Sequence, residues 1–100
     1  MSEAKDIKQS VELLASALQT LQTHEEAQAL LLDLLTPREI IELARRVEVA
    51  RLLDGGTSYV GIASRTGASS TTVSRVSKCL NGNTGGYRLV LDRLRIDEPT

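Results

Sequence analysis

The sequence has few aromatic residues: two tyrosines, and neither phenylalanine nor tryptophan, in 100 residues. Any core must therefore be built from leucine, isoleucine, valine and alanine, which bury less apolar area per side chain than aromatic residues do. A chain of this length also buries only a limited share of its surface when it folds alone. We therefore expect one small domain over residues 1–100 that associates with a second copy of itself.

Cysteine is almost absent as well, since Cys79 is the only one. An intramolecular disulfide is excluded, so we expect a reducing, cytoplasmic location and a Cys79 side chain that packs as a small apolar group. The apolar stretch Leu30–Leu35 is interrupted by Asp33 and is too short to cross a bilayer, and no secretory signal is visible. We therefore expect no association with a membrane.

Motifs for catalysis and for metal binding are also missing. The sequence has no histidine-carboxylate pairing, nucleophile elbow, Cys/His cluster or phosphate loop, and His24 has no partner at metal-ligand spacing. The pairs Gly55-Gly56 and Gly85-Gly86 lack the extended glycine spacing of a nucleotide motif and indicate turns. We expect neither an enzyme nor a metal site.

The formal net charge of −1 hides two halves of opposite sign. Residues 1–57 carry six Lys/Arg against ten Asp/Glu, a net charge of −4, whereas residues 58–100 carry six against three, a net charge of +3. No acidic residue occurs between Asp54 and Asp92. A positive, acid-free segment is what binding to phosphates requires.

The apolar residues repeat at helical spacing, and no stretch alternates as a half-buried strand does. The first helix has an a/d seam typical of helix-helix contact. Capping boxes predict two further helix starts, Thr23 with Glu26 and Thr36-Pro37 with Glu39. We predict an all-α fold of six helices, with dimerisation helices over 7–54, a helix-turn-helix over 58–80 and a C-terminal helix over 84–95. The seam consists of Ile7, Val11, Leu14, Leu18 and Leu21, and the expected buried face of the third helix of Ile40, Leu43, Ala44, Val47 and Ala50.

The segment Ser58–Leu80 is the most informative part of the chain. Gly67 can take the left-handed conformation that ends one helix and redirects the chain into the next. Ile62, Val73 and Val76 are expected to hold the two helices at a fixed angle. A plain helical hairpin with a solvated second helix is the alternative, but such a helix would favour residues of better helix propensity than serine and threonine. The predicted DNA-binding residues are Arg65, Ser69, Ser70, Thr71, Thr72, Ser74, Arg75 and Lys78.

Two of these cations have more than one interpretation. Arg75 can read a base, bind a phosphate or contact a small ligand, whereas Lys78 is expected on a phosphate. Arg65 is expected on a phosphate too, although it can also serve only to stabilise the C-terminus of its helix.

From about Leu30 to Leu94 the sequence resembles the Trp repressor family, and most closely the related group labelled YerC/YecD. The resemblance rests on LLTPREIIELARRVEVARLLDGG, followed by the helix-turn-helix, a glycine-containing loop and a final helix. It implies an all-helical, intertwined homodimer in which the N-terminal helices of each copy wrap the other. It also implies a DNA-binding transcriptional regulator.

The resemblance also implies a corepressor pocket. Arg46 and Arg75 match the two arginines that flank the ligand in that family, and Thr36 matches a residue that lines the pocket. Val76 and Cys79, however, replace a glycine and a serine of the family, and these departures argue against tryptophan as the ligand. A surface ion pair between Arg46 and Glu42 is the alternative role for this arginine.

We therefore expect a homodimeric, sequence-specific regulator, most simply a repressor, that binds a near-palindromic double-stranded DNA operator. One alternative is a repressor that responds to tryptophan or to another small, amino-acid-like corepressor. An alternative of another class is a protein-interaction module that has the fold but does not bind DNA. Salt-dependent binding to a duplex separates these classes.

Overall fold

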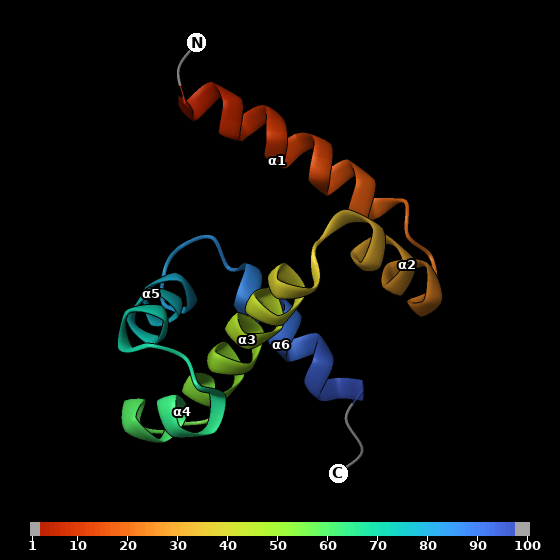
Figure 1. Cartoon of the computed structure of the whole chain (residues 1–100). Coiled ribbons are helices and arrows are strands. Elements are labelled where there is room, and N and C mark those ends of the chain that lie inside the picture. The colour runs from red at the N-terminus through yellow and green to blue at the C-terminus, as the bar shows by residue number, and fades with distance from the viewer. Residues whose placement is uncertain (1–2, 98–100) are drawn as a thin grey trace. The chain divides into compact units, whose positions relative to one another are not determined.

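The computed structural model describes residues 3–97, which form six α-helices and no β-strand, so the prediction of an all-α fold is confirmed. The chain forms two compact units, residues 1–40 and residues 41–100. That residues 1–100 make up a single domain stays a prediction. The helices are α1 (Glu3–Gln19), α2 (His24–Leu34), α3 (Pro37–Asp54), α4 (Tyr59–Thr66), α5 (Ser70–Leu80) and α6 (Gly86–Asp97) (Figure 1).

Helix starts in the first unit follow the predicted capping boxes. The Thr23 hydroxyl accepts a hydrogen bond from the Glu26 N–H at 3.1 Å, and the Glu26 carboxylate accepts one from the Gln22 N–H at 2.9 Å. At the start of α3 the exchange is reciprocal, because Thr36 N–H donates to the Glu39 carboxylate at 2.9 Å and Glu39 N–H donates to the Thr36 hydroxyl at 3.2 Å. Both capping boxes are confirmed.

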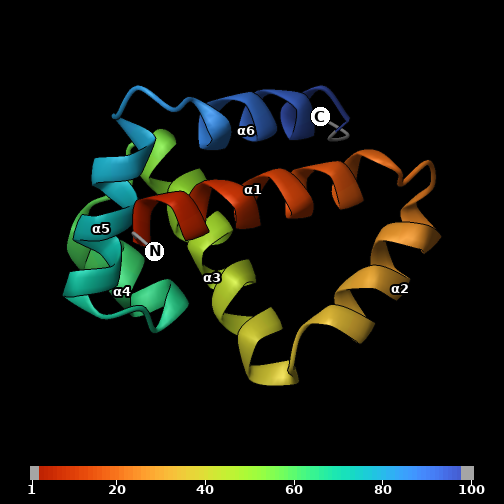
Figure 2. The ribbon, with the colours of Figure 1, turned by 90° about the horizontal axis from the view of Figure 1, so that it is seen from above.

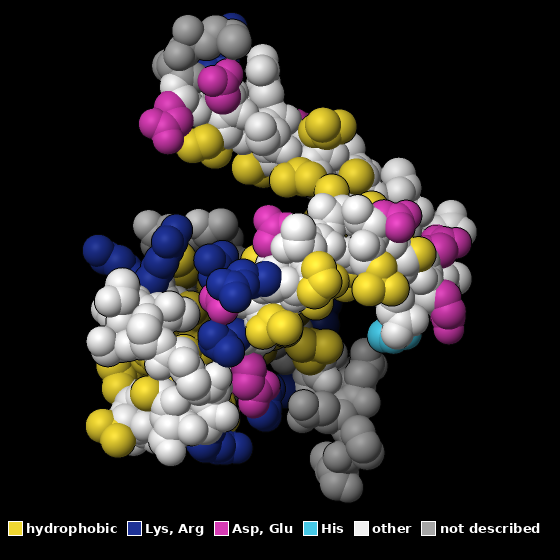
Figure 3. All heavy atoms as spheres, in the orientation of Figure 1, with side chains coloured by type: hydrophobic (Ala, Val, Ile, Leu, Met, Phe, Trp, Pro, Cys, Tyr) yellow, Lys and Arg dark blue, Asp and Glu magenta, His cyan; other side chains and the backbone are white. Residues whose placement is uncertain are grey.

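The first unit buries none of its apolar side chains fully: neither α1 nor α2 contains a buried residue. Four of the five predicted seam residues lie on α1 and are exposed, with Ile7, Val11 and Leu18 each 56% accessible and Leu14 48%, whereas Leu21 lies beyond the end of α1 and is half-buried. Hydrophobic side chains gather along α1 on the face shown in Figure 3. α1 also begins at Glu3, earlier than the start at residue 7 that the seam predicts.

The second unit contains the hydrophobic core, to which α3, α4, α5 and α6 all contribute. The predicted contacts of the helix-turn-helix are confirmed, since Ile62, Val73 and Val76 are at most 3% exposed. α4 and α5 lie on the same side of α3 in two perpendicular views (Figure 1 and Figure 2). The buried residues are Val49, Ala50, Leu52, Ile62, Ala68, Val73, Val76, Leu80 and Leu91.

The prediction of which face of α3 is buried is wrong for the single chain. Only Ala50 of that face is buried, whereas Leu43 and Val47 are 41% and 38% exposed. The core instead uses the neighbouring face, with Val49 and Leu52. α3 therefore has two apolar faces, and only one of them is covered by α4, α5 and α6.

Glycine turns direct the chain from α3 into α4 and from α4 into α5. Gly56 has φ +86°, and the N–H groups of Gly56 and Thr57 donate to the carbonyls of Leu53 and Leu52 at 3.1 and 3.0 Å, the pattern of a Schellman motif. Gly67 has φ +74° and its N–H donates to the Ala63 carbonyl at 2.9 Å. The turn predicted at Gly67 is confirmed.

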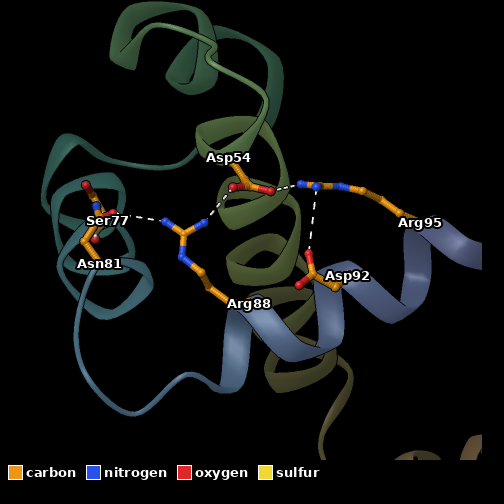
Figure 4. Close-up of polar contacts among 6 residues, drawn as sticks. All are labelled: Asp54, Ser77, Asn81, Arg88, Asp92 and Arg95. Atoms are coloured by element: carbon orange, nitrogen blue, oxygen red, sulfur yellow. Dashed lines mark hydrogen bonds and ion pairs between the residues drawn. The ribbon is translucent and has the colours of Figure 1, made fainter.

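A polar network ties α6 to the ends of α3 and α5 (Figure 4). The Asp54 carboxylate, whose side chain is only 15% exposed, accepts from Arg88 at 2.8 Å and also pairs with Arg95. Arg88 donates a second hydrogen bond to the Asn81 side-chain oxygen at 3.1 Å, and Asn81 donates to the Ser77 carbonyl at 2.9 Å. α6 continues to Asp97, two residues beyond its predicted end.

Candidate nucleic-acid interface

α5 is held with one face inward and the opposite face toward solvent. Val73, Val76 and Leu80 are 1%, 3% and 4% exposed, so the rotation of the helix about its own axis is fixed by core packing. Its N-terminus is capped by Ser69, whose hydroxyl accepts from the Thr72 N–H at 3.1 Å. The second helix of a helix-turn-helix is therefore present in a defined orientation relative to α4.

Most of the predicted DNA-binding residues of α5 lie on its exposed face. Two differ from this expectation in detail: Thr72 is half-buried, and the Ser69 hydroxyl both caps the helix and donates to the Thr72 hydroxyl at 3.1 Å. Ser69 itself is exposed. The other residues are exposed, namely Ser70, Thr71, Ser74, Arg75 and Lys78.

The cations of α5 are unpaired, whereas two of the three arginines of α6 are paired. Within residues 3–97, Arg75 and Lys78 form no ion pair or hydrogen bond to another residue, whereas Arg88 and Arg95 both pair with Asp54. This difference follows from the sequence, since no carboxylate occurs between residues 54 and 92. Two guanidinium or ammonium groups without partners leave the exposed face of α5 available to an anion.

Arg65, at the end of α4, is exposed but has an acidic neighbour. A hydrogen bond from Arg51 is the main cause that holds the pKa of Glu48 below its ordinary value, and the charges of Arg51 and Arg65 lower this pKa further. Arg65 therefore lies close enough to Glu48 to act on it electrostatically. A contact between Arg65 and DNA phosphate stays a prediction.

A shallow hollow of about 600 Å³, the α4–α5 hollow, lies over the exposed face of α5. It brings together five of the predicted residues and adds Tyr59, the first residue of α4, which is 50% exposed. Sequence reasoning missed Tyr59 because a lone tyrosine at the first position of a helix fits no pattern. The lining residues are Tyr59, Ser70, Thr71, Ser74, Arg75 and Lys78.

A second hollow of about 220 Å³, the arginine hollow, brings Arg46 of α3 together with Arg75 of α5. The ion pair expected as an alternative for Arg46 is not formed, since Glu42 pairs with Arg45 at 3.0 Å and Arg46 forms no polar contact within residues 3–97. Thr36 belongs to the first unit, where its hydroxyl caps α3. The lining residues are Arg46, Thr71, Thr72, Arg75, Val76, Cys79 and Tyr87.

Two residues that replace the family's ligand-pocket residues differ in their burial. Val76 is 3% exposed and packs in the core, so its branched side chain is fixed. Cys79 is exposed, and the expectation that it packs as a buried side chain is wrong for the single chain. The reason is its place on α5: it lines two open hollows that α5 forms with residues of α3 and α6, and these hollows leave its side chain accessible.

Neither a metal-binding cluster nor a membrane-spanning helix is present among the described residues. No group of three or more His, Cys, Asp or Glu side chains among residues 3–97 could hold a metal ion. None of the helices in the same range is long and apolar enough to span a bilayer.

The fold and this surface define a helix-turn-helix protein, and similarity to known proteins gives the family. The family model described as Trp repressor protein matches residues 9–95, which includes parts of both units. The chain belongs to the Trp repressor family.

Several relatives agree with this assignment. YerC, an uncharacterized protein of Bacillus subtilis (strain 168), is 42% identical over 85 residues, which are 85% of this chain and 82% of YerC. The crystal structure of a TrpR-like protein from Eubacterium eligens ATCC 27750 is 41% identical, has a TM-score of 0.78 and covers 91% of this chain and 94% of its own. A Staphylococcus aureus protein proposed to be a Trp repressor is 31% identical, with a TM-score of 0.81 and coverage of 99% and 100%.

Proposed function

We propose that this protein is a homodimeric, sequence-specific DNA-binding transcriptional regulator that acts as a repressor. The observation that carries the proposal is the exposed face of α5, where four hydroxyl- or cation-bearing side chains surround unpaired Arg75 in a segment without carboxylates. Such a helix can enter a major groove, because its donors match base edges and phosphate oxygens. Membership of the Trp repressor family supports the same function.

Within this surface we assign base contacts to Ser70, Thr71 and Arg75 and a phosphate contact to Lys78. Ser70 and Thr71 lie at the N-terminus of the recognition helix, the part that contacts base edges, and Lys78 lies two turns further along α5. Arg75 lies between them and has the longest side chain of the three residues assigned to bases. Thr71→Ala or Arg75→Ala should cost about 1–3 kcal/mol of binding and relax specificity, and Lys78→Ala should weaken binding to all sequences alike. Equal losses on operator and random duplexes for all three variants would contradict the assignment.

Exposed apolar surface supports the homodimer. Ile7, Val11, Leu14 and Leu18 of α1 are about half exposed, and Val47 and Val90, which are 38% and 48% exposed, line an open apolar hollow of about 640 Å³ in the second unit. Side chains of this kind at this exposure favour burial against another chain. A two-fold dimer of helix-turn-helix units predicts a near-palindromic operator whose half-sites are about 10 bp apart, centre to centre.

In vitro selection of duplexes from a random pool, followed by salt titration of the selected duplex, tests the function. We expect enrichment of a near-palindrome and a steep loss of affinity between about 50 and 200 mM salt. A protein-interaction module of the same fold would enrich no sequence and would show no such salt dependence. That outcome would overturn the proposal.

The arginine hollow supports a second candidate, an effector-responsive repressor. Its two guanidinium groups, neither paired to another residue within 3–97, can hold a small ligand with a carboxylate, as an amino-acid-like corepressor has. Free tryptophan is a poor fit because the fixed Val76 side chain lines this hollow, and overpacking typically costs about 1–3 kcal/mol. The chain has no tryptophan, so the fluorescence of added tryptophan reports its binding without background. Saturable binding at low micromolar concentration that tightens operator binding would contradict the exclusion of tryptophan.

A further inference from the structure

We infer that the hydroxyl group of Tyr59 donates a hydrogen bond to a backbone phosphate of the bound DNA, at the edge of the α4–α5 hollow. This inference rests on the proposed DNA-binding function and adds a contact from α4 to a surface otherwise built by α5. Tyr59 is the only residue of α4 that lines this hollow.

The placement of Tyr59 beside α5 is fixed by its neighbours. Ser58 caps α4 by accepting from the Gly61 N–H at 3.1 Å, which sets where the helix begins. Ile62, three residues after Tyr59, is 0% exposed and anchors the same end of α4 in the core. The left-handed turn at Gly67 then fixes the direction of α5. Tyr59 is therefore carried on a rigid element and not on a loop.

The chemistry of the hollow suits an anion. Four of its six lining residues carry hydroxyl groups and the other two, Arg75 and Lys78, are cations, so the lining side chains are hydrogen-bond donors and include no carboxylate. Tyr59 is 50% exposed and forms no hydrogen bond to another residue within 3–97. Its hydroxyl group is thus available as a donor next to a positively charged surface.

A phosphate is the expected partner of Tyr59 and a base edge is not. In a helix-turn-helix the first helix crosses the sugar-phosphate backbone, and the second helix enters the groove. Tyr59 belongs to the first of these helices, at the end that lies beside the exposed face of α5. The predicted contact therefore contributes affinity without sequence information.

The test compares Tyr59→Phe with Ser64→Ala, which are matched because each removes one hydroxyl oxygen from α4. Ser64 is exposed and does not line the α4–α5 hollow, so its variant controls for the loss of a hydroxyl group from this helix in general. We expect Tyr59→Phe to weaken binding about three- to tenfold on the selected operator and on random duplex alike. Ser64→Ala should leave both affinities unchanged, and thermal melts should show that both variants fold.

Salt dependence identifies the kind of contact. A neutral hydroxyl releases no counterion, so Tyr59→Phe should leave the slope of log affinity against log salt unchanged, whereas Lys78→Ala should reduce its magnitude by about 0.9. Scanning single methylphosphonate substitutions through the operator should find one phosphate in each half-site at which Tyr59→Phe causes no further loss. No loss for Tyr59→Phe, or a loss on the operator alone, would overturn the inference while leaving DNA binding intact. Absence of salt-dependent duplex binding by the unaltered protein would instead overturn the proposed function.

Discussion

Residues 3–40 and residues 41–97 are both rich in leucine, isoleucine and valine, but only the second group buries them. The second unit contains all nine buried hydrophobic residues of the described chain, while α1 and α2 contain none. α2 nevertheless begins with a complete capping box, and α1 has an exposed row of apolar side chains along one face. This difference agrees with the proposed homodimer, in which the first unit contacts another chain, whereas the second unit has a core of its own.

α3 shows the same contrast within one helix. Its C-terminal half buries Val49 and Leu52, and the adjacent face leaves Leu43 and Val47 more than one-third exposed. Helices that are apolar on two faces are usually covered on both. The uncovered face of α3 is therefore a further apolar surface, within the second unit, that is available to the proposed dimer contact.

Among the changes predicted here, charges placed in the apolar seam of α1 should have the largest effect, and they should act on dimer formation. The double substitution Leu14→Asp with Leu18→Asp should abolish the dimer, because each carboxylate buried without a partner costs roughly 3–5 kcal/mol. Light scattering coupled to size exclusion measures the mass directly. We expect a dimer for the unaltered protein and a monomer or aggregate for this variant.

The control for this experiment is Ser16→Asp, which adds a charge to an exposed position of α1 on the side opposite Leu14. It should leave the dimer unchanged. If the seam variant remained a dimer of normal stability, the exposed apolar residues of α1 would not form the dimer contact. A monomeric unaltered protein would contradict the proposed homodimer.

A cavity in the core of the second unit should have the next largest effect. Ile62→Ala truncates a side chain that is 0% exposed and should lower the free energy of unfolding by about 2–5 kcal/mol, measured by urea titration. Val60→Ala, on the same helix but 81% exposed, should change it by less than about 0.5 kcal/mol. Equal losses for the two variants would show that α4 is not anchored through Ile62.

The features predicted correctly from the sequence are those determined within a few residues. The capping boxes at Thr23 and Thr36 depend on side chains that bond to a backbone three residues away, and the turn at Gly67 depends on a backbone hydrogen bond to Ala63, four residues earlier. The packing of Ile62, Val73 and Val76 could also be predicted, because the helix-turn-helix is itself a short local unit.

Features that depend on distant segments could not be predicted. Periodicity showed that α3 is amphipathic, but not which of two adjacent apolar faces α4, α5 and α6 would cover. The ion pair between Asp54 and Arg88 joins residues 34 apart, so no local pattern indicates it. Tyr59 lies eleven or more residues from the α5 side chains that it joins in the α4–α5 hollow, and only the path of the chain through Gly67 brings them together.

Adding a methyl group at Gly67 should lower the free energy of unfolding by a smaller amount, because only the backbone conformation at this residue disfavours a side chain. A Cβ at this position would meet nothing within 4 Å, so Gly67→Ala has no steric conflict with neighbours and is penalised only by its φ of +74°. We expect a loss of about 1–2 kcal/mol in the free energy of unfolding. Gly86→Ala has the same open surroundings without a positive φ and, at the start of α6, should be neutral or slightly stabilising. Equal effects in the two variants would contradict a backbone origin.

The smallest expected effect is the pH dependence of the cap of α3, in the first unit. The hydrogen bond from the Thr36 N–H, and then the one involving the Thr36 hydroxyl, hold the pKa of Glu39 below its ordinary value of 4.5. Because the folded pKa is the lower one, this stabilisation is present above pH 4.5 and is lost as the pH falls through the folded pKa.

Glu39→Gln keeps the length and the hydrogen-bonding oxygen of the side chain but cannot titrate. The unaltered protein should therefore melt at a higher temperature than Glu39→Gln at neutral pH, and the two should converge as the solution is acidified. All other carboxylates are common to both proteins, so the difference between their melting temperatures isolates Glu39. A difference that stayed constant with pH would mean that the charge of Glu39 does not stabilise the start of α3.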